Sequence, residues 1–205
     1  DYGCGFGVFA KIVAKKSKKV FGIDHSKNEI EVCKKIHSDI GNLEFQFKPI
    51  TEFKRNSFDF VISNQVIEHV HNPGQYLSNI NRVLKNNGEL IISIPNISTP
   101  RHFLVPLSKR HFNYLKKNSK KILKSYDKTN LHINSWDPIH FTHLLGTCGF
   151  EIEEFIETEG LALPQQITKI GLPSYINTNT RFKGWSYTLV FKFLKRKEVT
   201  IDPLD

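Results

Sequence analysis

The chain has 205 residues, 39% of them hydrophobic, which is enough for a single domain with its own core. No apolar run approaches the ~20 residues that a membrane-spanning helix needs, which excludes a transmembrane protein of that kind over this sequence. The cysteines Cys4, Cys33 and Cys148 have neither disulfide nor zinc-ligand spacing, so we expect a reduced, cytoplasmic setting. The net charge of +9 comes mainly from lysine, and either an anionic partner or a lysine-rich source composition would produce it.

Glycine occupies alternate positions in the opening segment, Asp-Tyr-Gly-Cys-Gly-Phe-Gly over residues 1–7. Glycine lets the backbone turn tightly and approach a ligand, and the apolar stretch that follows predicts a helix over 8–16. Such a junction between strand and helix is typical of nucleotide-type sites. Two phosphate-binding versions are excluded, because Val8 stands where a dinucleotide fingerprint needs glycine and no Gly-Lys-Ser/Thr follows. The carboxylate of Asp1 would repel phosphate and favours a cationic ligand.

A short apolar strand is predicted over residues 20–24, and it ends in Asp24. In doubly wound sheets an acid at this point accepts hydrogen bonds from ribose hydroxyls, about 20 residues beyond the glycine loop. A helix is predicted over 26–38 with Ser26 as its N-cap. Asp24 could also cap that helix, and the two roles are compatible.

Strand and helix patterns then alternate along the chain. Strands are predicted over 43–47, 58–64 and 89–94, with a helix that begins at Pro73 and ends at Asn87-Gly88. After an irregular stretch over 97–135, a helix runs from Asp137 or Pro138 through Leu145 and is closed by Gly149, and strands follow over 150–156 and 185–194. This alternation predicts a parallel sheet with helices on both faces.

Four motifs in a fixed order carry a family resemblance: Asp1-x-Gly3-Cys4-Gly5-x-Gly7, Gly22-Ile23-Asp24, Phe58–Asn64 and Val66–Val70. Together they resemble the class I S-adenosylmethionine (SAM)-dependent methyltransferases, and within them the ubiquinone-biosynthesis-type branch. The resemblance implies an α/β, Rossmann-like, doubly wound, mostly parallel seven-stranded sheet, with the strand at 185–194 inserted antiparallel between its two predecessors. We expect a single methyltransferase domain over 1–205 with a cap insertion at about 97–135. Because the family's first strand precedes Asp1, we also expect a fragment of a longer protein.

The resemblance implies SAM as the cofactor. The Gly5 carbonyl would receive the methionine ammonium with support from Asp1, and Asp24 would hold the ribose. Many relatives carry an acid after the third strand that binds the adenine amino group; this chain lacks it, although Ile50 could still pack on the adenine. The residues expected to contact the cofactor are Asp1, Gly3, Cys4, Gly5, Gly7, Asp24, His25, Ile50, Asn64 and Gln65.

Polar residues gather just beyond the strand at 58–64, where open parallel sheets bind ligands. Some quinone O-methyltransferases carry Glu where this chain has Gln65, and with the next Glu-His pair they bind a divalent metal. Because hard cations prefer anionic oxygen, Gln65 weakens any magnesium-type site, and we predict no metal. His69 is instead a candidate general base, because a histidine pKa of ~6.5 suits removal of a hydroxyl proton. His132 is the second candidate, and a structural role is the alternative for both.

We therefore predict methyl transfer to a small-molecule acceptor at oxygen or carbon, such as a quinone precursor, a sugar or a secondary metabolite. The acceptor would bind over 64–69, and the irregular segments at 97–135 and 160–184 would select it. A lysine-rich amphipathic helix predicted over 108–126 would either contact an anionic membrane or cover the core. Two other functions stay open. Charge alone favours an RNA methyltransferase, and the missing adenine acid with Gln65 favours a non-catalytic SAM-binding or interaction subunit. The sequence gives no indication of oligomeric state.

Overall fold

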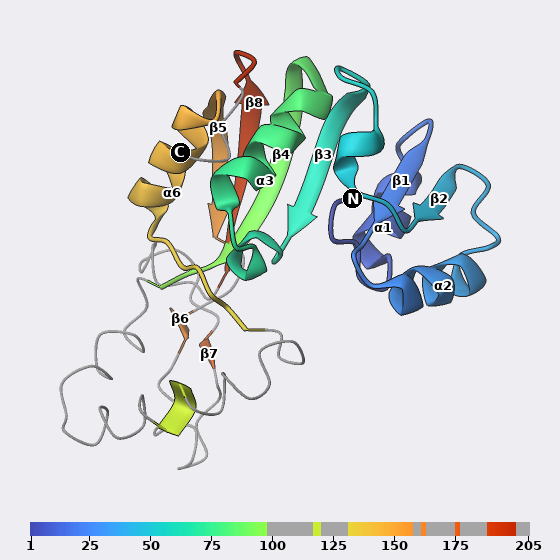
Figure 1. Cartoon of the computed structure of the whole chain (residues 1–205), viewed down its shortest axis with the longest axis horizontal. Helices are drawn as coiled ribbons and strands as arrows, with labels where there is room; N and C mark the ends of the chain where they lie inside the picture. The colour runs from blue at the N-terminus through green and yellow to red at the C-terminus, as the bar shows by residue number, and fades with distance from the viewer. Residues whose placement is uncertain (98–116, 120–130, 158–160, 163–174, 177–187, 200–205) are drawn as a thin grey trace.

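The computed structural model describes residues 1–97, 117–119, 131–157, 161–162, 175–176 and 188–199 (Figure 1). In chain order, the elements are α1 (Val8–Ala14), β1 (Val20–Ile23), α2 (Lys27–Ile36), β2 (Leu43–Gln46), η1 (Ile50–Glu52), β3 (Phe58–Asn64), η2 (Ile67–His69), α3 (Pro73–Val83), β4 (Leu84–Pro95), α6 (Pro138–Thr147), β5 (Phe150–Glu157), β6 (Leu161–Ala162), β7 (Tyr175–Ile176) and β8 (Thr188–Lys195). The predicted helix over 108–126 lies almost wholly outside the described residues, as does most of the expected cap at 97–135.

Four strands form the larger sheet, in the order β3-β4-β8-β5. β3 runs parallel to β4, while β8 runs antiparallel to both β4 and β5, with Phe191 opposite Ile92 on one side and Phe155 on the other. In Figure 1, α3 lies in front of β4 and α6 lies beside β5. The expected antiparallel insertion of the last strand is therefore confirmed, over Thr188–Lys195 among the described residues.

The smaller sheet, β1 with β2, is joined to the larger one by the first residues of the chain. The backbone N–H of Ile23 donates to the carbonyl of Asp1 at 2.9 Å, and the N–H of Tyr2 donates to the carbonyl of Ile62 in β3 at 2.8 Å. Asp1 and Tyr2 thus lie between β1 and β3, which gives the spatial order β2-β1-β3-β4-β8-β5. The doubly wound, mostly parallel α/β fold is confirmed.

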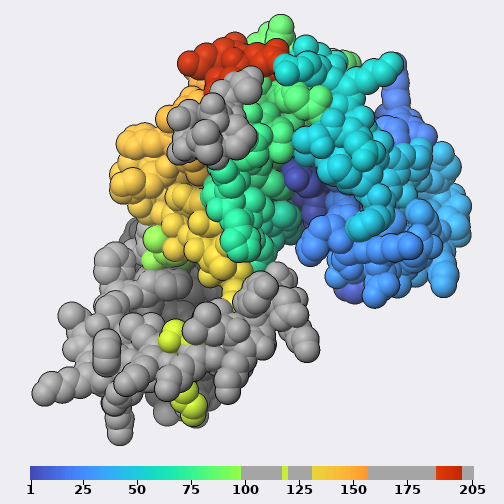
Figure 2. Space-filling model, in the orientation of Figure 1, coloured from blue at the N-terminus to red at the C-terminus, as the bar shows by residue number. Residues whose placement is uncertain are grey.

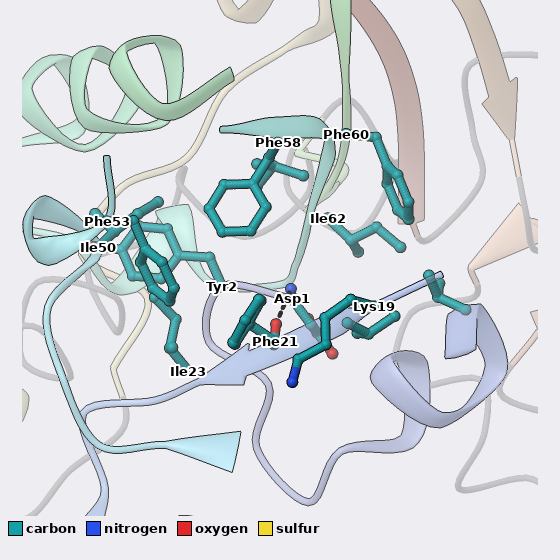
Figure 3. A pocket seen from close by; sticks show the side chains of 13 residues that line it. Asp1, Tyr2, Lys19, Phe21, Ile23, Ile50, Phe53, Phe58, Phe60 and Ile62 are labelled. Atoms are coloured by element: carbon teal, nitrogen blue, oxygen red, sulfur yellow. Dashed lines mark hydrogen bonds between the residues drawn. The ribbon is translucent and has the colours of Figure 1, made fainter. Parts of the chain in front are cut away.

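A narrow apolar pocket lies between β1 and β3 (Figure 3). Its walls include the aromatic side chains of Phe21, Phe53, Phe58 and Phe60. In open α/β sheets, ligands bind at the carboxyl ends of the parallel strands. This pocket is lined in part by the residues at the amino-terminal ends of β1 and β3, including Val20 and Phe58. The pocket therefore lacks the placement expected of a ligand site in this kind of sheet. The expectation that a strand precedes Asp1 stays a prediction.

Side-chain caps begin α2, α3 and α6, close to where the sequence predicts these helices to start. Ser26 accepts a hydrogen bond from the N–H of Glu29 at the start of α2, and Asp137 accepts two at the start of α6. Pro73 opens α3 at its first turn, where its missing N–H costs nothing, and Asn72 caps it. These local signals fix the helix starts independently of the rest of the fold.

The end of α3 differs from the prediction. The helix ends at Val83 rather than at Asn87-Gly88, and Leu84 already has the extended backbone of β4. Leu84 pairs with Phe58, and its carbonyl accepts a hydrogen bond of 2.8 Å from the buried ammonium of Lys195. Because these partners come from distant parts of the chain, the local pattern did not indicate where the helix stops.

Two apolar clusters form the core. The larger one lies among β3, β4, β8, α3 and α6, and includes the fully buried ring of Phe141. The smaller one lies beneath α1 and α2 and includes Ala10, Ile30, Cys33 and Phe45. Within the described residues, no helix is both long and apolar enough to cross a membrane.

Candidate functional site

The glycine loop closes against the end of β1. The N–H groups of Gly3 and Cys4 both donate to the carbonyl of Ile23, at 2.8 and 3.0 Å. Gly3, Gly5 and Gly7 all have positive φ, between 50° and 78°, which side chains rarely tolerate.

Packing explains two of these glycines but not the third. A Cβ at Gly3 would lie 2.4 Å from a methyl group of Val66, and one at Gly7 would lie 2.5 Å from the ring of Phe45. A Cβ at Gly5 would meet no described atom within 4 Å. Gly5 therefore faces open space, as a loop that approaches a ligand with its backbone requires.

Asp24 lies beside this opening and is 8% exposed. One carboxylate oxygen accepts the N–H of Gly5 at 3.0 Å, and the other accepts the N–H of Ser26 at 2.9 Å. The exposed imidazole of His25 lies 3.2 Å from the second oxygen. A carboxylate has about four acceptor positions, so capacity remains for ribose hydroxyls. Ser26 is the N-cap of α2, so Asp24 supports the start of this helix through the Ser26 N–H rather than by capping it. The ribose role of Asp24 stays a prediction.

The other loop residues are held by local contacts. Asp1 accepts the N–H of Ala10 at 2.9 Å, in the first turn of α1. The Gly5 carbonyl, predicted to receive the methionine ammonium, accepts a hydrogen bond from the thiol of Cys33 at 3.0 Å. Burial, with smaller contributions from Cys33 and Asp24, raises the pKa of Cys4 to about 12. The side chain of Cys33, in α2, is fully buried beneath the loop.

Ile50 lies in η1, and its side chain packs in the larger core with 3% exposure. The guanidinium of Arg82 donates to the Ile50 carbonyl and to two neighbouring carbonyls, which holds this turn against α3. Contact between Ile50 and adenine stays a prediction.

The carboxyl ends of β3 and β4 meet at Ser93. Its hydroxyl donates to Asn64 at 2.7 Å and accepts from the backbone N–H of Gln65 at 3.1 Å. Gln65 has a φ of 54°, a strained value for a residue with a side chain. A cavity of about 410 Å³ opens here, lined by Phe9, Ile62, Ser63, Asn64, Gln65, Ile91, Ser93, Thr188 and Val190. Its volume falls within the range of ligand pockets, roughly 300–1,000 Å³.

Both predicted catalytic histidines come together just beyond this edge. The ring centroids of His69, in η2, and His132 lie 4.8 Å apart, and the planes of the two rings make an angle of 78°. The Nδ1 of His69 lies 2.9 Å from the carbonyl of Leu131, and the carbonyl of Glu68 accepts the N–H groups of Ile133 and Asn134. These bonds hold the segment at 131–134 against η2 (Figure 2, yellow beside green). The sequence proposed each histidine separately and gave no sign that they meet.

Glu68 is the member of this group that sequence reasoning left without a role. Its side chain is fully buried, and neither carboxylate oxygen has a hydrogen-bond partner among the described residues. The Nε2 of His69 lies 3.9 Å from one of these oxygens. Burial raises the pKa of Glu68. Desolvation, and to a smaller extent the nearby His69, lower the pKa of His132.

Tyr76 is a second residue that the sequence did not single out. Its hydroxyl lies 2.8 Å from the hydroxyl of Ser63 in β3, and its ring stacks on Tyr2 with centroids 4.5 Å apart. The apolar spacing of α3 identified Tyr76 only as a core residue. Its hydroxyl thus connects α3 to the strand that leads into the site.

Comparison with known proteins places this geometry in a family. The family model described as "Methyltransferase domain" matches residues 1–147. A ubiquinone biosynthesis O-methyltransferase of Bradyrhizobium diazoefficiens is 31% identical over 99 residues, which cover 47% of this chain and 39% of that protein. One from Pelagibacter ubique is 30% identical, over 47% of this chain and 41% of that protein. The matched part of the chain thus spans about two fifths of the length of these curated relatives.

Solved structures share the fold. A putative methyltransferase of Haloferax volcanii, in complex with the Trm112 methyltransferase activator, superposes with a TM-score of 0.66 at 16% identity, covering 96% of this chain and 81% of that one. A putative S-adenosylmethionine-dependent methyltransferase of Listeria monocytogenes gives 0.64 at 18% identity, covering 96% and 90%. The family match and these folds confirm the resemblance that the four motifs indicated, and with it SAM as the methyl donor that the family implies. The chain therefore belongs to the methyltransferase domain family, with the class I fold of SAM-dependent methyltransferases.

Proposed function

We propose that this chain transfers the methyl group of SAM to a hydroxyl oxygen of a small-molecule acceptor. The observation that carries the proposal is the pair of imidazoles, His69 and His132, gathered with their rings 4.8 Å apart just past the carboxyl end of β3. A hydroxyl is a weak nucleophile until its proton leaves, and neutral histidine is suited to accept it. The curated relatives, named as ubiquinone biosynthesis O-methyltransferases, support oxygen as the acceptor atom.

The residues at the glycine loop fit the cofactor. Gly5 faces open space, and Asp24 keeps acceptor capacity beside it. The carboxylate would accept the ribose hydroxyls, while the Gly5 carbonyl would meet the ammonium. When bound, SAM supplies an electrophilic methyl group on a sulfonium, so the protein has mainly to align the acceptor with it and exclude water.

The acceptor would bind over residues 64–69, of which Asn64 and Gln65 line the cavity at the strand ends and His69 does not. Phe9 and Val190 give the cavity apolar walls, while Asn64 and Gln65 give it polar groups that could orient a hydroxyl. The proton sits on Nδ1 of His69, because the carbonyl of Leu131 can only accept a hydrogen bond. Nε2 would then be the nitrogen that takes the acceptor's proton.

The test begins with calorimetric titration of SAM and S-adenosylhomocysteine, followed by turnover of labelled SAM on a panel of phenols and catechols. We expect binding and turnover. His69→Gln should lower kcat by about 10²- to 10⁴-fold, the contribution of a general base, and leave S-adenosylhomocysteine affinity unchanged. His71→Gln replaces an exposed histidine nearby and should change neither quantity.

Two results would contradict the proposal. Binding of SAM without turnover on any acceptor would favour a non-catalytic SAM-binding subunit. Methylation of RNA, with retention that falls steeply as salt is added, would favour the nucleic-acid function instead.

A further inference from the structure

We propose that Cys33 in α2 and His37 at its C-cap, together the α2 pair, are positioning residues for the amino-acid end of the methyl donor. The thiol of Cys33 donates to the carbonyl of Gly5 at 3.0 Å. Four residues on, the Nε2 of His37 lies 3.0 Å from the carbonyl of Phe6. Side chains four residues apart lie on the same face of a helix, so the α2 pair holds two consecutive carbonyls of the glycine loop.

Both side chains of the α2 pair are buried as hydrogen-bond donors. Cys33 is fully buried and His37 is 8% exposed. Burial raises the pKa of Cys33, so the group stays a thiol that can donate. A carbonyl can only accept, so the nitrogen of His37 that faces Phe6 carries the ring proton. The ring of His37 also stacks on Phe45 with centroids 5.6 Å apart, and this contact keeps the imidazole in place.

Gly5 is held through its backbone on both sides. Its N–H donates to Asp24 and its carbonyl accepts from Cys33. A Cβ at Gly5 would meet no described atom within 4 Å, so packing does not hold this residue. Glycine has a wide choice of backbone conformations, and hydrogen bonds must therefore select one. The direction of the Gly5 carbonyl thus depends on α2.

The inference rests on the proposed function, in which the Gly5 carbonyl accepts the ammonium of the donor. A carbonyl oxygen has two acceptor positions, and Cys33 occupies one of them. The thiol of Cys4 is farther from this oxygen, at 3.8 Å, which leaves the second position to a charged donor. A hydrogen bond from a charged group is strong, and its strength depends on the direction that the α2 pair sets. The α2 pair should therefore matter for the amino-acid end of the donor and not for its adenosine end.

Two ligands separate these ends. S-adenosylhomocysteine has both, whereas methylthioadenosine has the adenosine and the sulfur but no amino acid. By calorimetric titration, we expect Cys33→Ala and His37→Phe each to weaken S-adenosylhomocysteine binding about fivefold, the usual effect of one lost hydrogen bond, with methylthioadenosine binding unchanged. Cys33→Ser keeps a donor and should bind both ligands like the parent. Cys148→Ala is the matched control and should change neither affinity, because it removes an equally buried thiol from the larger core cluster, whereas Cys33 lies in the smaller one.

The proposal is overturned if the folded variants lose affinity for both ligands by the same factor, which is the effect of a merely structural role, or if neither affinity changes. It is also overturned if Cys33→Ser binds as weakly as Cys33→Ala. Thermal unfolding checks that each variant is folded, and Cys33→Ala, the smaller change, decides if His37→Phe does not fold. A parent chain that binds neither ligand would refute the cofactor site and with it the proposed function. A parent that binds S-adenosylhomocysteine, with variants in which the ratio of the two affinities stays constant, would refute this inference alone.

Discussion

The backbone N–H of Gly5 donates a hydrogen bond of 3.0 Å to the carboxylate of Asp24, which joins the glycine loop to the end of β1. The other oxygen of the same carboxylate accepts the N–H of Ser26 just before α2. One nearly buried side chain therefore fixes both the loop and the following helix. Its role in folding and its proposed role in binding ribose should be separable by measurement.

Replacement of Asp24 by Asn should impair both stability and cofactor binding. The amide can offer only one acceptor oxygen, so one of the two backbone N–H groups loses its partner, at a cost of about 1–3 kcal/mol in the free energy of unfolding. We expect S-adenosylhomocysteine affinity to fall at least tenfold by calorimetry. Ser26→Ala is the matched control, because it removes the cap of α2 at about 1 kcal/mol without touching the loop. Unchanged affinity in Asp24→Asn would refute the ribose role.

Alanine at Gly3 and at Gly5 should have different consequences. At Gly3 the added methyl meets Val66 at 2.4 Å and the backbone is left-handed, so we expect a loss of about 2–4 kcal/mol in chemical denaturation. At Gly5 only the left-handed backbone opposes the change, at about 1–2 kcal/mol. Gly5→Ala should nevertheless weaken S-adenosylhomocysteine binding, because its methyl enters the open space beside Asp24. Equal stability losses with unchanged binding at Gly5 would contradict this reading of the loop.

The hydroxyl pair of Tyr76 and Ser63 should behave as a coupled unit. Both side chains are buried and their oxygens lie 2.8 Å apart, so Tyr76→Phe and Ser63→Ala should each cost about 1–3 kcal/mol by leaving one hydroxyl without a partner. The double variant removes both hydroxyls and should lose less than the sum of the two single variants. Urea denaturation of all four proteins measures the coupling, and additive losses would show that the contact adds no stability.

The three cysteines should be unreactive in the folded protein. Cys4, Cys33 and Cys148 are all buried, and burial raises the pKa of each thiol, that of Cys4 to about 12. Since the thiolate is the reactive form, labelling by a maleimide at pH 7 should be slow until guanidinium unfolds the chain. Rapid labelling of Cys4 in the native protein would mean that the glycine loop opens readily.

Much of the fold follows from short-range pattern. The glycine spacing, the acid at the end of β1, the cap at Ser26 and the helix start near Asp137 are properties of a few neighbouring residues, and the structure has each of them where the pattern predicts it. The antiparallel insertion of β8 was implied by the family resemblance rather than by its own residues. The predicted end of α3 at Asn87-Gly88 was wrong. Leu84 already belongs to β4, because it pairs with Phe58 and its carbonyl accepts a hydrogen bond from Lys195, and both partners are far away in the sequence.

The sequence by itself indicated the alternating α/β fold and the conformation of the glycine loop, because glycine conformation, capping and hydrophobic period act locally. The class I methyltransferase fold followed from the family resemblance of the four motifs. The sequence named His69 and His132 but not their proximity. Only the tertiary structure brought them beside the buried Glu68, whose carboxylate has no hydrogen-bond partner among the described residues, and placed the Cys33 thiol on the Gly5 carbonyl. These groupings depend on how the segment at 131–134 packs on η2 and on how α2 packs under the glycine loop. Contacts between segments that are distant in the sequence produce no periodic pattern from which they could be predicted.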